Sequence, residues 1–125
     1  MKLEFFKCEV CGNIAVKIVD SKVPLVCCGQ EMTLLNANTT DAAQEKHVPV
    51  VEVNGNIVEV TVGEVEHPMV EEHYIQFITI ETEKTVQTAR LQPGEKPYAK
   101  FALADDDKLV AAYEYCNLHG LWKKQ

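Results

Sequence analysis

The sequence predicts a mostly β protein, with a small N-terminal metal-binding domain followed by an antiparallel β-sandwich. The first observation is that four of the five cysteines lie within the first 28 residues. The second is a series of short β-branched runs, separated by turn residues, after position 47. A polar, turn-rich stretch over 34–44 separates these regions, so we place the boundary near Asn36 and expect domains at 1–36 and 37–125.

The N-terminal domain is expected to depend on a metal. A segment of about three dozen residues cannot bury a self-sufficient core, and such small domains need a staple. The sequence "MKLEFFKCEV" is not typical of a signal peptide, and no apolar run is long enough to span a bilayer. We therefore expect a cytoplasmic protein, in which spaced cysteines bind metals or take part in catalysis.

The C-terminal region is expected to be built from strands. Segment 48–63 has two β-branched runs around Asn54-Gly55, a pair typical of a hairpin. Further strands are predicted over 74–81, 85–91, 98–103 and 109–115. The acidic run 105–107 is interpreted as a solvated loop. Only 40–46 has helical character, with Thr40 or Asp41 as a cap.

The formal net charge of −7 bears on the partners of the protein. Nucleic acids and anionic membranes are bound by basic surfaces, which a chain of this charge is not expected to offer. We therefore expect neither as a partner.

The four N-terminal cysteines predict one metal site. Cys8 and Cys11 have the Cys-x2-Cys spacing, and Cys27 and Cys28 are adjacent, so two pairs of thiolates can complete a tetrahedral site. Adjacent cysteines direct their sulfurs to opposite sides of the backbone, so we expect a distorted tetrahedron. The spacing fits a structural zinc knuckle or an iron electron-transfer centre. A disulfide between Cys27 and Cys28 would be strained.

The remaining cysteine and the four histidines suggest a second site. Cys116 and His119 are three residues apart and could chelate a metal from one loop. His47, His67 and His73 are expected at strand edges or in loops, where ligands from distant segments can converge. Most single histidines are surface or core residues and not ligands, so both interpretations stay open on this evidence.

Five stretches together resemble desulfoferrodoxin, the two-iron class of superoxide reductase: CEVCGN, LVCCGQEM, EKHVPV, HPMVEEHYI and EYCNLHGLW. The resemblance runs in order from Lys7 to Trp122. It implies a desulforedoxin-like or rubredoxin-like N-terminal domain, an immunoglobulin-like sandwich and a homodimer. It also implies one-electron reduction of superoxide to hydrogen peroxide without dioxygen production, with a rubredoxin-like electron donor.

The resemblance also implies a division of the ligands between two iron ions. The first would be held by Cys8, Cys11, Cys27 and Cys28, with zinc as a further possibility. The second would have equatorial His47, His67, His73 and His119, axial Cys116 and an open sixth position. Four thiolates leave a ferrous ion with a negative charge, whereas four neutral imidazoles and one thiolate leave a positive charge that attracts an anion.

Two residues beside His47 receive catalytic roles from the same resemblance. Glu45 would occupy the sixth position of the oxidised iron, and Lys46 would attract superoxide and organise water. On residue type alone, both would be ordinary solvated side chains.

Three alternatives follow from the residues. The first is a zinc knuckle joined to a β-sandwich binding module, and the second is an electron-transfer iron protein without catalysis. The third is another non-haem iron enzyme, although no 2-His-1-carboxylate pattern is evident.

Overall fold

The computed structural model describes residues 2–39, 44–64 and 67–125, with only the backbone described at positions 44 and 45. The chain divides into two compact units, Met1–Asn36 and Ala37–Gln125. Within the described residues, no helix has both the length and the apolar character needed to cross a membrane.

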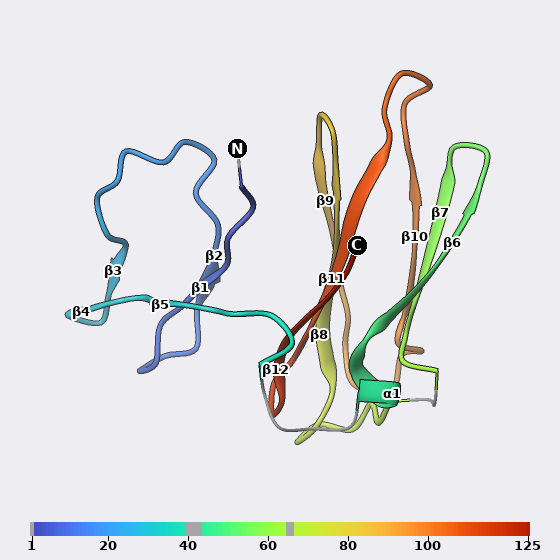
Figure 1. Cartoon of the computed structure of the whole chain (residues 1–125). Coiled ribbons are helices and arrows are strands. Elements are labelled where there is room, and N and C mark those ends of the chain that lie inside the picture. The colour runs from blue at the N-terminus through green and yellow to red at the C-terminus, as the bar shows by residue number, and fades with distance from the viewer. Residues whose placement is uncertain (1, 40–43, 65–66) are drawn as a thin grey trace. The chain divides into compact units, whose positions relative to one another are not determined.

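The N-terminal unit consists of two small antiparallel sheets (Figure 1). One has the order β2-β1-β5 and the other pairs β3 with β4. The strands are β1 (Phe6–Lys7), β2 (Ile14–Ala15), β3 (Val26–Cys27), β4 (Gln30–Glu31) and β5 (Thr33–Leu34). Among residues 2–36, only Phe5 and Cys8 are buried. The unit has almost no apolar core, as its short length predicts.

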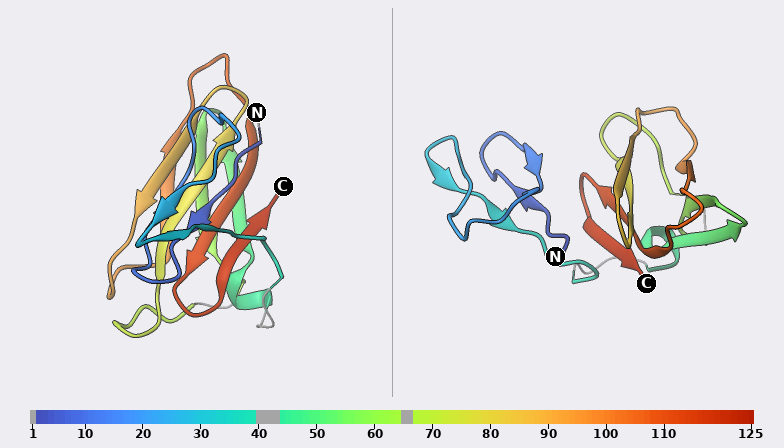
Figure 2. Two further views of the ribbon diagram at one scale, coloured as in Figure 1. Left: turned by 90° about the vertical axis from the view of Figure 1, so that its left-hand side faces the viewer. Right: turned by 90° about the horizontal axis from the view of Figure 1, so that it is seen from above.

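The C-terminal unit is an antiparallel β-sandwich. Its sheets have the orders β10-β7-β6 and β12-β11-β8-β9. The strands are β6 (Pro49–Asn54), β7 (Ile57–Val62), β8 (Ile75–Thr82), β9 (Val86–Arg90), β10 (Tyr98–Ala102), β11 (Leu109–Cys116) and β12 (Gly120–Lys124). A three-plus-four arrangement of this kind is typical of immunoglobulin-like folds. The prediction of a mostly β chain with this sandwich is confirmed (Figure 2).

The core of the sandwich lies between the facing sheets. Strand β7 alternates half-buried and fully buried residues, so Val58, Val60 and Val62 face inward. They belong to the same buried cluster as Ile78 and Ile80 of β8. This alternation is the period-two pattern expected of a strand with one buried face. The core fixes the strand ends from which the candidate site is built.

Two local features differ from the sequence prediction. The hairpin turn consists of Gly55 and Asn56, because Asn54 pairs with Ile57 as the last residue of β6. Gly55 has a φ of 60°, which suits the first central position of a II′ turn. Strand β12 was not predicted. The helical turn expected in this segment is present as α1 (Gln44–His47), and the suggested cap residues at 40 and 41 lie outside the described residues.

The acidic run is solvated at only two of its three positions. Asp105 and Asp106 are exposed, whereas Asp107 is buried. The carboxylate of Asp107 accepts hydrogen bonds from the Thr82 hydroxyl at 2.6 Å and from the backbone N–H of Lys84 at 3.2 Å. The interpretation of the whole run as a solvated loop is therefore wrong at Asp107, which holds the β8–β9 turn to the loop before β11.

Candidate metal centres

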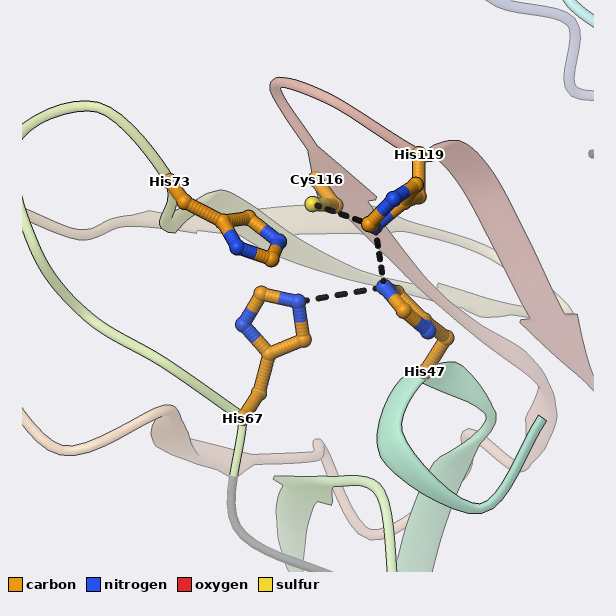
Figure 3. A group of neighbouring side chains, drawn as sticks. All are labelled: His47, His67, His73, Cys116 and His119. Carbon is orange, nitrogen blue, oxygen red and sulfur yellow. Dashed lines mark hydrogen bonds between the residues drawn. The ribbon is translucent and has the colours of Figure 1, made fainter. Parts of the chain in front are cut away.

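Four imidazoles and one thiol converge at one end of the sandwich (Figure 3). His47 ends α1, Cys116 ends β11 and His119 lies in the loop between β11 and β12. His67 and His73 lie in the segment that precedes β8. Their five donor atoms all lie within 4.8 Å of one another. The structure thus brings together the whole second ligand set suggested by the sequence.

The four imidazole rings form a closed ring of near-perpendicular neighbours. Successive ring centroids lie 4.7 Å (His47–His67), 4.7 Å (His67–His73), 5.0 Å (His73–His119) and 4.9 Å (His119–His47) apart. The Nε2 atom of His47 is 3.1 Å from both His67 Nε2 and His119 Nδ1. The centre of a square with this edge lies about 2.2 Å from each corner, close to the bond of about 2.0–2.1 Å that imidazole forms with zinc.

The hydrogen bonding of the rings fits a bound cation. His67 Nδ1 is 2.7 Å from its neighbour's carbonyl, Pro68 O, so Nδ1 carries the proton and Nε2 presents a lone pair. One proton on His47 Nε2 cannot satisfy both nitrogens beside it. The buried Nε2 of His73 has no hydrogen-bond partner within the described part of the chain. A metal ion bound at their centre would satisfy these converging lone pairs.

The pKa values of the donors are consistent with this arrangement. Burial lowers the pKa of His67 to about 4 and also lowers the pKa of His73, so both rings are neutral at pH 7. Burial raises the pKa of the Cys116 thiol, and hydrogen bonds from the backbone amides of His119 and Leu118 oppose this increase. Neutral imidazoles are competent ligands, and metal binding would displace the thiol proton.

Trp122 contacts two of the histidines, His47 and His119. Its indole ring stacks on His47 with a centroid distance of 5.0 Å and an interplanar angle of 24°. Its Nε1–H donates to the backbone carbonyl of His119 at 3.1 Å. The side chain is buried, so it forms part of the wall on which the ligands are held.

Of the two residues before His47, the structure describes the side chain of Lys46 but not that of Glu45. Lys46 is exposed. The pKa of His73 is lowered mainly by burial, and the charge of His119 and the positive charge of Lys46 lower it further. The Lys46 ammonium therefore acts electrostatically on the histidine ring. The side chain of Glu45 lies outside the described part of the structure.

Asn117 is a part of the site that sequence reasoning missed. Its side-chain amide accepts a hydrogen bond from Tyr74 N and donates one to Glu72 O, so it contacts both neighbours of His73. The available signal was an asparagine directly after the strand-ending Cys116. Asparagine side chains often bond to backbone where a strand gives way to a loop.

The structure also brings together the four N-terminal cysteines. Their sulfurs lie within 4.8 Å of one another, with 3.6 Å between Cys11 and Cys27 and 3.9 Å between Cys27 and Cys28. The expected divergence of adjacent sulfurs does not arise, because Cys28 and Gly29 form the two-residue turn between β3 and β4. Their φ angles of 53° and 74° are those of a I′ turn.

The four thiols perturb one another. A hydrogen bond from the Cys11 amide lowers the pKa of Cys8 to about 6. Hydrogen bonding with Cys11 and Cys8 raises the pKa of Cys28 to about 12 and also raises the pKa of Cys27. Four sulfurs this close cannot all ionise unless a cation compensates their negative charge. A bound metal ion would supply that positive charge.

Comparisons with known proteins identify the family of the chain. The family model described as desulfoferrodoxin matches residues 39–125, and the model of the desulfoferrodoxin N-terminal domain matches residues 1–35. The chain belongs to the desulfoferrodoxin family. A desulfoferrodoxin from Syntrophotalea carbinolica is 49% identical over 124 residues, covering 99% of this chain and 97% of the relative.

Two solved structures extend the similarity to the fold. The superoxide reductase from Treponema pallidum matches with a TM-score of 0.85 and 38% identity, covering 100% of both chains. The 1Fe superoxide reductase from Giardia intestinalis has a TM-score of 0.57 and 35% identity, covering 64% of this chain and 95% of its own.

Proposed function

We propose that this desulfoferrodoxin family member is a superoxide reductase whose reaction takes place at His47, His67, His73, Cys116 and His119. The observation that carries the proposal is the convergence of four imidazole nitrogens and one thiol within 4.8 Å. The names of the similar structures give the substrate class. In the reaction, superoxide takes up one electron and two protons to form hydrogen peroxide, and no dioxygen is released.

Iron is the metal proposed for this site, where it would supply the electron and attract the anionic substrate. Other residues of the protein orient the donors. His67 is fixed through its Nδ1 contact with Pro68 O, and the rings of His47 and His119 are supported by Trp122. Cys116 is the donor of the set that can carry a negative charge, and as a thiolate it would favour electron donation by the metal.

Two residues on α1 are proposed to act on the substrate side. Lys46 is exposed and adds a positive charge beside the histidines, which would draw superoxide toward the site. Glu45 is proposed as a ligand of the oxidised iron in the absence of substrate, on the resemblance of the EKHVP motif alone.

The N-terminal unit is proposed to hold a second iron through Cys8, Cys11, Cys27 and Cys28, with zinc as the alternative occupant. We propose that domains 1–36 and 37–125 keep the two centres separate, because each ligand set lies within one domain. The five free thiols favour a reducing compartment, and we propose the cytoplasm. A rubredoxin-like electron donor and a homodimer complete the proposal, on the family resemblance.

A stoichiometric experiment tests the function. Purified protein is analysed for iron, reduced, and mixed with superoxide while an excess electron donor is present. A reductase forms one peroxide for every superoxide, whereas a dismutase forms one peroxide and one dioxygen from two. Dioxygen release, or zinc as the sole metal in protein made with ample iron, would rule out the proposal. The latter result would favour a zinc knuckle joined to a binding module.

A further inference from the structure

The loop that carries His119 begins with Asn117, whose side chain makes hydrogen bonds that backbone groups make in a regular ladder. Strand β11 pairs with β12 up to Cys116 and Gly120, so a three-residue loop, 117–119, joins the two strands. On its other side β11 pairs with β8 through a bulge, where Tyr115 opposes Phe77 but Cys116 opposes Ile75. The chain must leave the β8 ladder at this point to let His119 turn toward the other histidines.

Asn117 continues the ladder with its side chain. Its backbone N–H donates to Tyr74 O at 3.2 Å, as the next residue of an antiparallel strand would. The return bond from Tyr74 N, at 2.9 Å, goes to the side-chain Oδ1 and not to the backbone carbonyl. The side-chain Nδ2 then donates to Glu72 O at 3.0 Å. The side-chain amide of Asn117 thus takes the place of a backbone peptide group in the ladder. The backbone of Asn117 can therefore turn away from β8 into the loop.

These bonds join the ligand segments on both sides of the site. Glu72 and Tyr74 are the two neighbours of His73, which lies at the end of a tight turn closed by reciprocal 3.1 Å bonds with Val70. Asn117 directly follows Cys116 and lies two residues before His119. One amide therefore fixes the segment of His73 against the loop that carries Cys116 and His119.

We propose that Asn117 is a positioning residue of the five-donor centre, which holds His73 at the distance from Cys116 and His119 that metal binding requires. The inference rests on the proposed metal site and adds a residue that contacts ligand segments without being a ligand. Residues that orient ligands typically change metal affinity by about 10- to 100-fold when they are replaced. Because Asn117 acts on backbone and not on a ring, we expect a loss of about 10-fold for Asn117→Ala.

The same unit contains a control. Asn56 donates its side-chain Nδ2 to Leu103 O at 3.1 Å, and its backbone carbonyl accepts from Leu103 N at 2.7 Å. It thus joins the β6–β7 turn to the residue after β10, and neither segment carries a ligand or Trp122. Asn56→Ala removes this side-chain amide.

The experiment measures ferrous iron affinity by competition with a bipyridyl-type chelator on the full chain. The charge-transfer absorption of the oxidised five-donor centre is recorded alongside, and circular dichroism checks that each variant is folded. Asn117→Ala should bind iron about 10-fold more weakly at the five-donor centre. The affinity of this centre in Asn56→Ala, and the four-cysteine centre in both variants, should be unchanged.

The possible failures are distinguishable. Wild-type protein that binds no iron at the five-donor centre would overturn the proposed function itself. Wild-type binding with unchanged affinity in folded Asn117→Ala would overturn only the role of Asn117. Equal losses in Asn56→Ala and Asn117→Ala would also overturn that role, because they would show an effect of general stability.

Discussion

At the scale of single residues, the five donors differ in the charge that they can bring to a metal. His67 is held neutral by burial, which outweighs the opposite effect of its hydrogen bond to Pro68 O, so it offers a lone pair at any pH near neutrality. Cys116 alone can bring a negative charge, and its burial disfavours that charge in the absence of a cation. Metal binding is therefore expected to displace the proton of this thiol.

Replacing Cys116 should change the electronic character of the proposed iron centre. Cys116→Ser keeps a small side chain at a fully buried position but removes the sulfur. The charge-transfer absorption of the oxidised centre should disappear, while the histidine ligands can still bind iron. Visible spectra and iron analysis of the same sample measure both effects. Persistence of the band at full intensity would show that Cys116 is not the thiolate ligand.

Lys46 should govern how fast superoxide reaches the site. The chain carries a net charge of −7, so its mean field repels an anion, and the exposed Lys46 places a positive charge close to His73. Electrostatic steering raises association rates by about 10- to 1,000-fold. One exposed lysine should contribute near the lower end, so Lys46→Ala should react about 10-fold more slowly at low salt. Pulse radiolysis measures this rate.

The control for this experiment is Lys100→Ala. Lys100 is an exposed residue of β10, and its loss changes the net charge by the same amount. The difference between the two variants should shrink with added salt, because the screening length falls to about 3 Å at 1 M ionic strength. Equal low-salt rates for Lys46→Ala and Lys100→Ala would exclude local steering by Lys46.

At the scale of secondary-structure elements, strands with alternating burial could be predicted from the sequence, and turns could not be placed reliably. Strand β7 shows why: its buried valines alternate with half-buried residues, which is a strong periodic signal. Gly55 marked the hairpin, but the turn is one residue later than expected because strand pairing fixed the register. Strand β12 was missed because its residues, Gly120–Lys124, have little β-branched character.

The candidate ligands were identifiable from residue type, and their surroundings were not. Cys28 is an example, because its left-handed φ depends on the pairing of Cys27 with Gln30 across a turn. The supporting contacts of Asn117 and Trp122 join segments far apart in the chain. Such contacts depend on the tertiary fold and leave only a weak trace in local sequence.

The buried Asp107 gives a prediction at this scale. Hydrogen bonding from the Thr82 hydroxyl, together with the amides of Lys108 and Lys84, holds its pKa below the ordinary range for aspartate. A depressed pKa in the folded state stabilises the protein above the unfolded-state pKa, and this stabilisation is lost as the pH falls through the folded-state pKa. Asp107→Asn should therefore lower Tm by several degrees at pH 7, with a smaller difference from wild type below about pH 4.

The measurement for Asp107 is thermal unfolding of both proteins across pH, followed by circular dichroism. The difference in Tm between variant and wild type is the relevant quantity, because acid release of metal affects both proteins. Asp106→Asn serves as the control, since Asp106 is exposed and its ion pair with Lys84 is at the surface. A difference for Asp107→Asn that stays constant down to pH 3 would contradict the proposed charge dependence.

At the scale of the whole molecule, charge and metal chemistry are divided between the two units. Residues 1–36 contain four lysines and four acidic residues and are formally neutral. The remaining eight basic and fifteen acidic residues give the sandwich unit the entire net charge of −7. The unit proposed to receive an anion is thus the one that repels anions overall, which is why a local positive charge at the site matters.

The last prediction concerns the independence of the two centres. All five donors of the histidine site belong to the sandwich unit, whereas all four N-terminal cysteines belong to the other unit. The N-terminal unit has little apolar core, so its folding should depend on its metal. Cys28→Asn removes one thiolate but keeps a residue that tolerates the left-handed turn at position 28. It should therefore abolish metal binding at the four-cysteine centre without straining the backbone.

The measurement combines metal analysis, visible spectra and the rate of superoxide reduction by the pre-reduced five-donor centre. In Cys28→Asn, the absorption of the four-cysteine centre should be lost, and the N-terminal unit should become sensitive to proteolysis. The reaction rate at the histidine site should stay within about twofold of wild type, because all five of its ligands belong to residues 37–125. A large loss of rate with the histidine site still loaded with iron would show that the two units are coupled in catalysis.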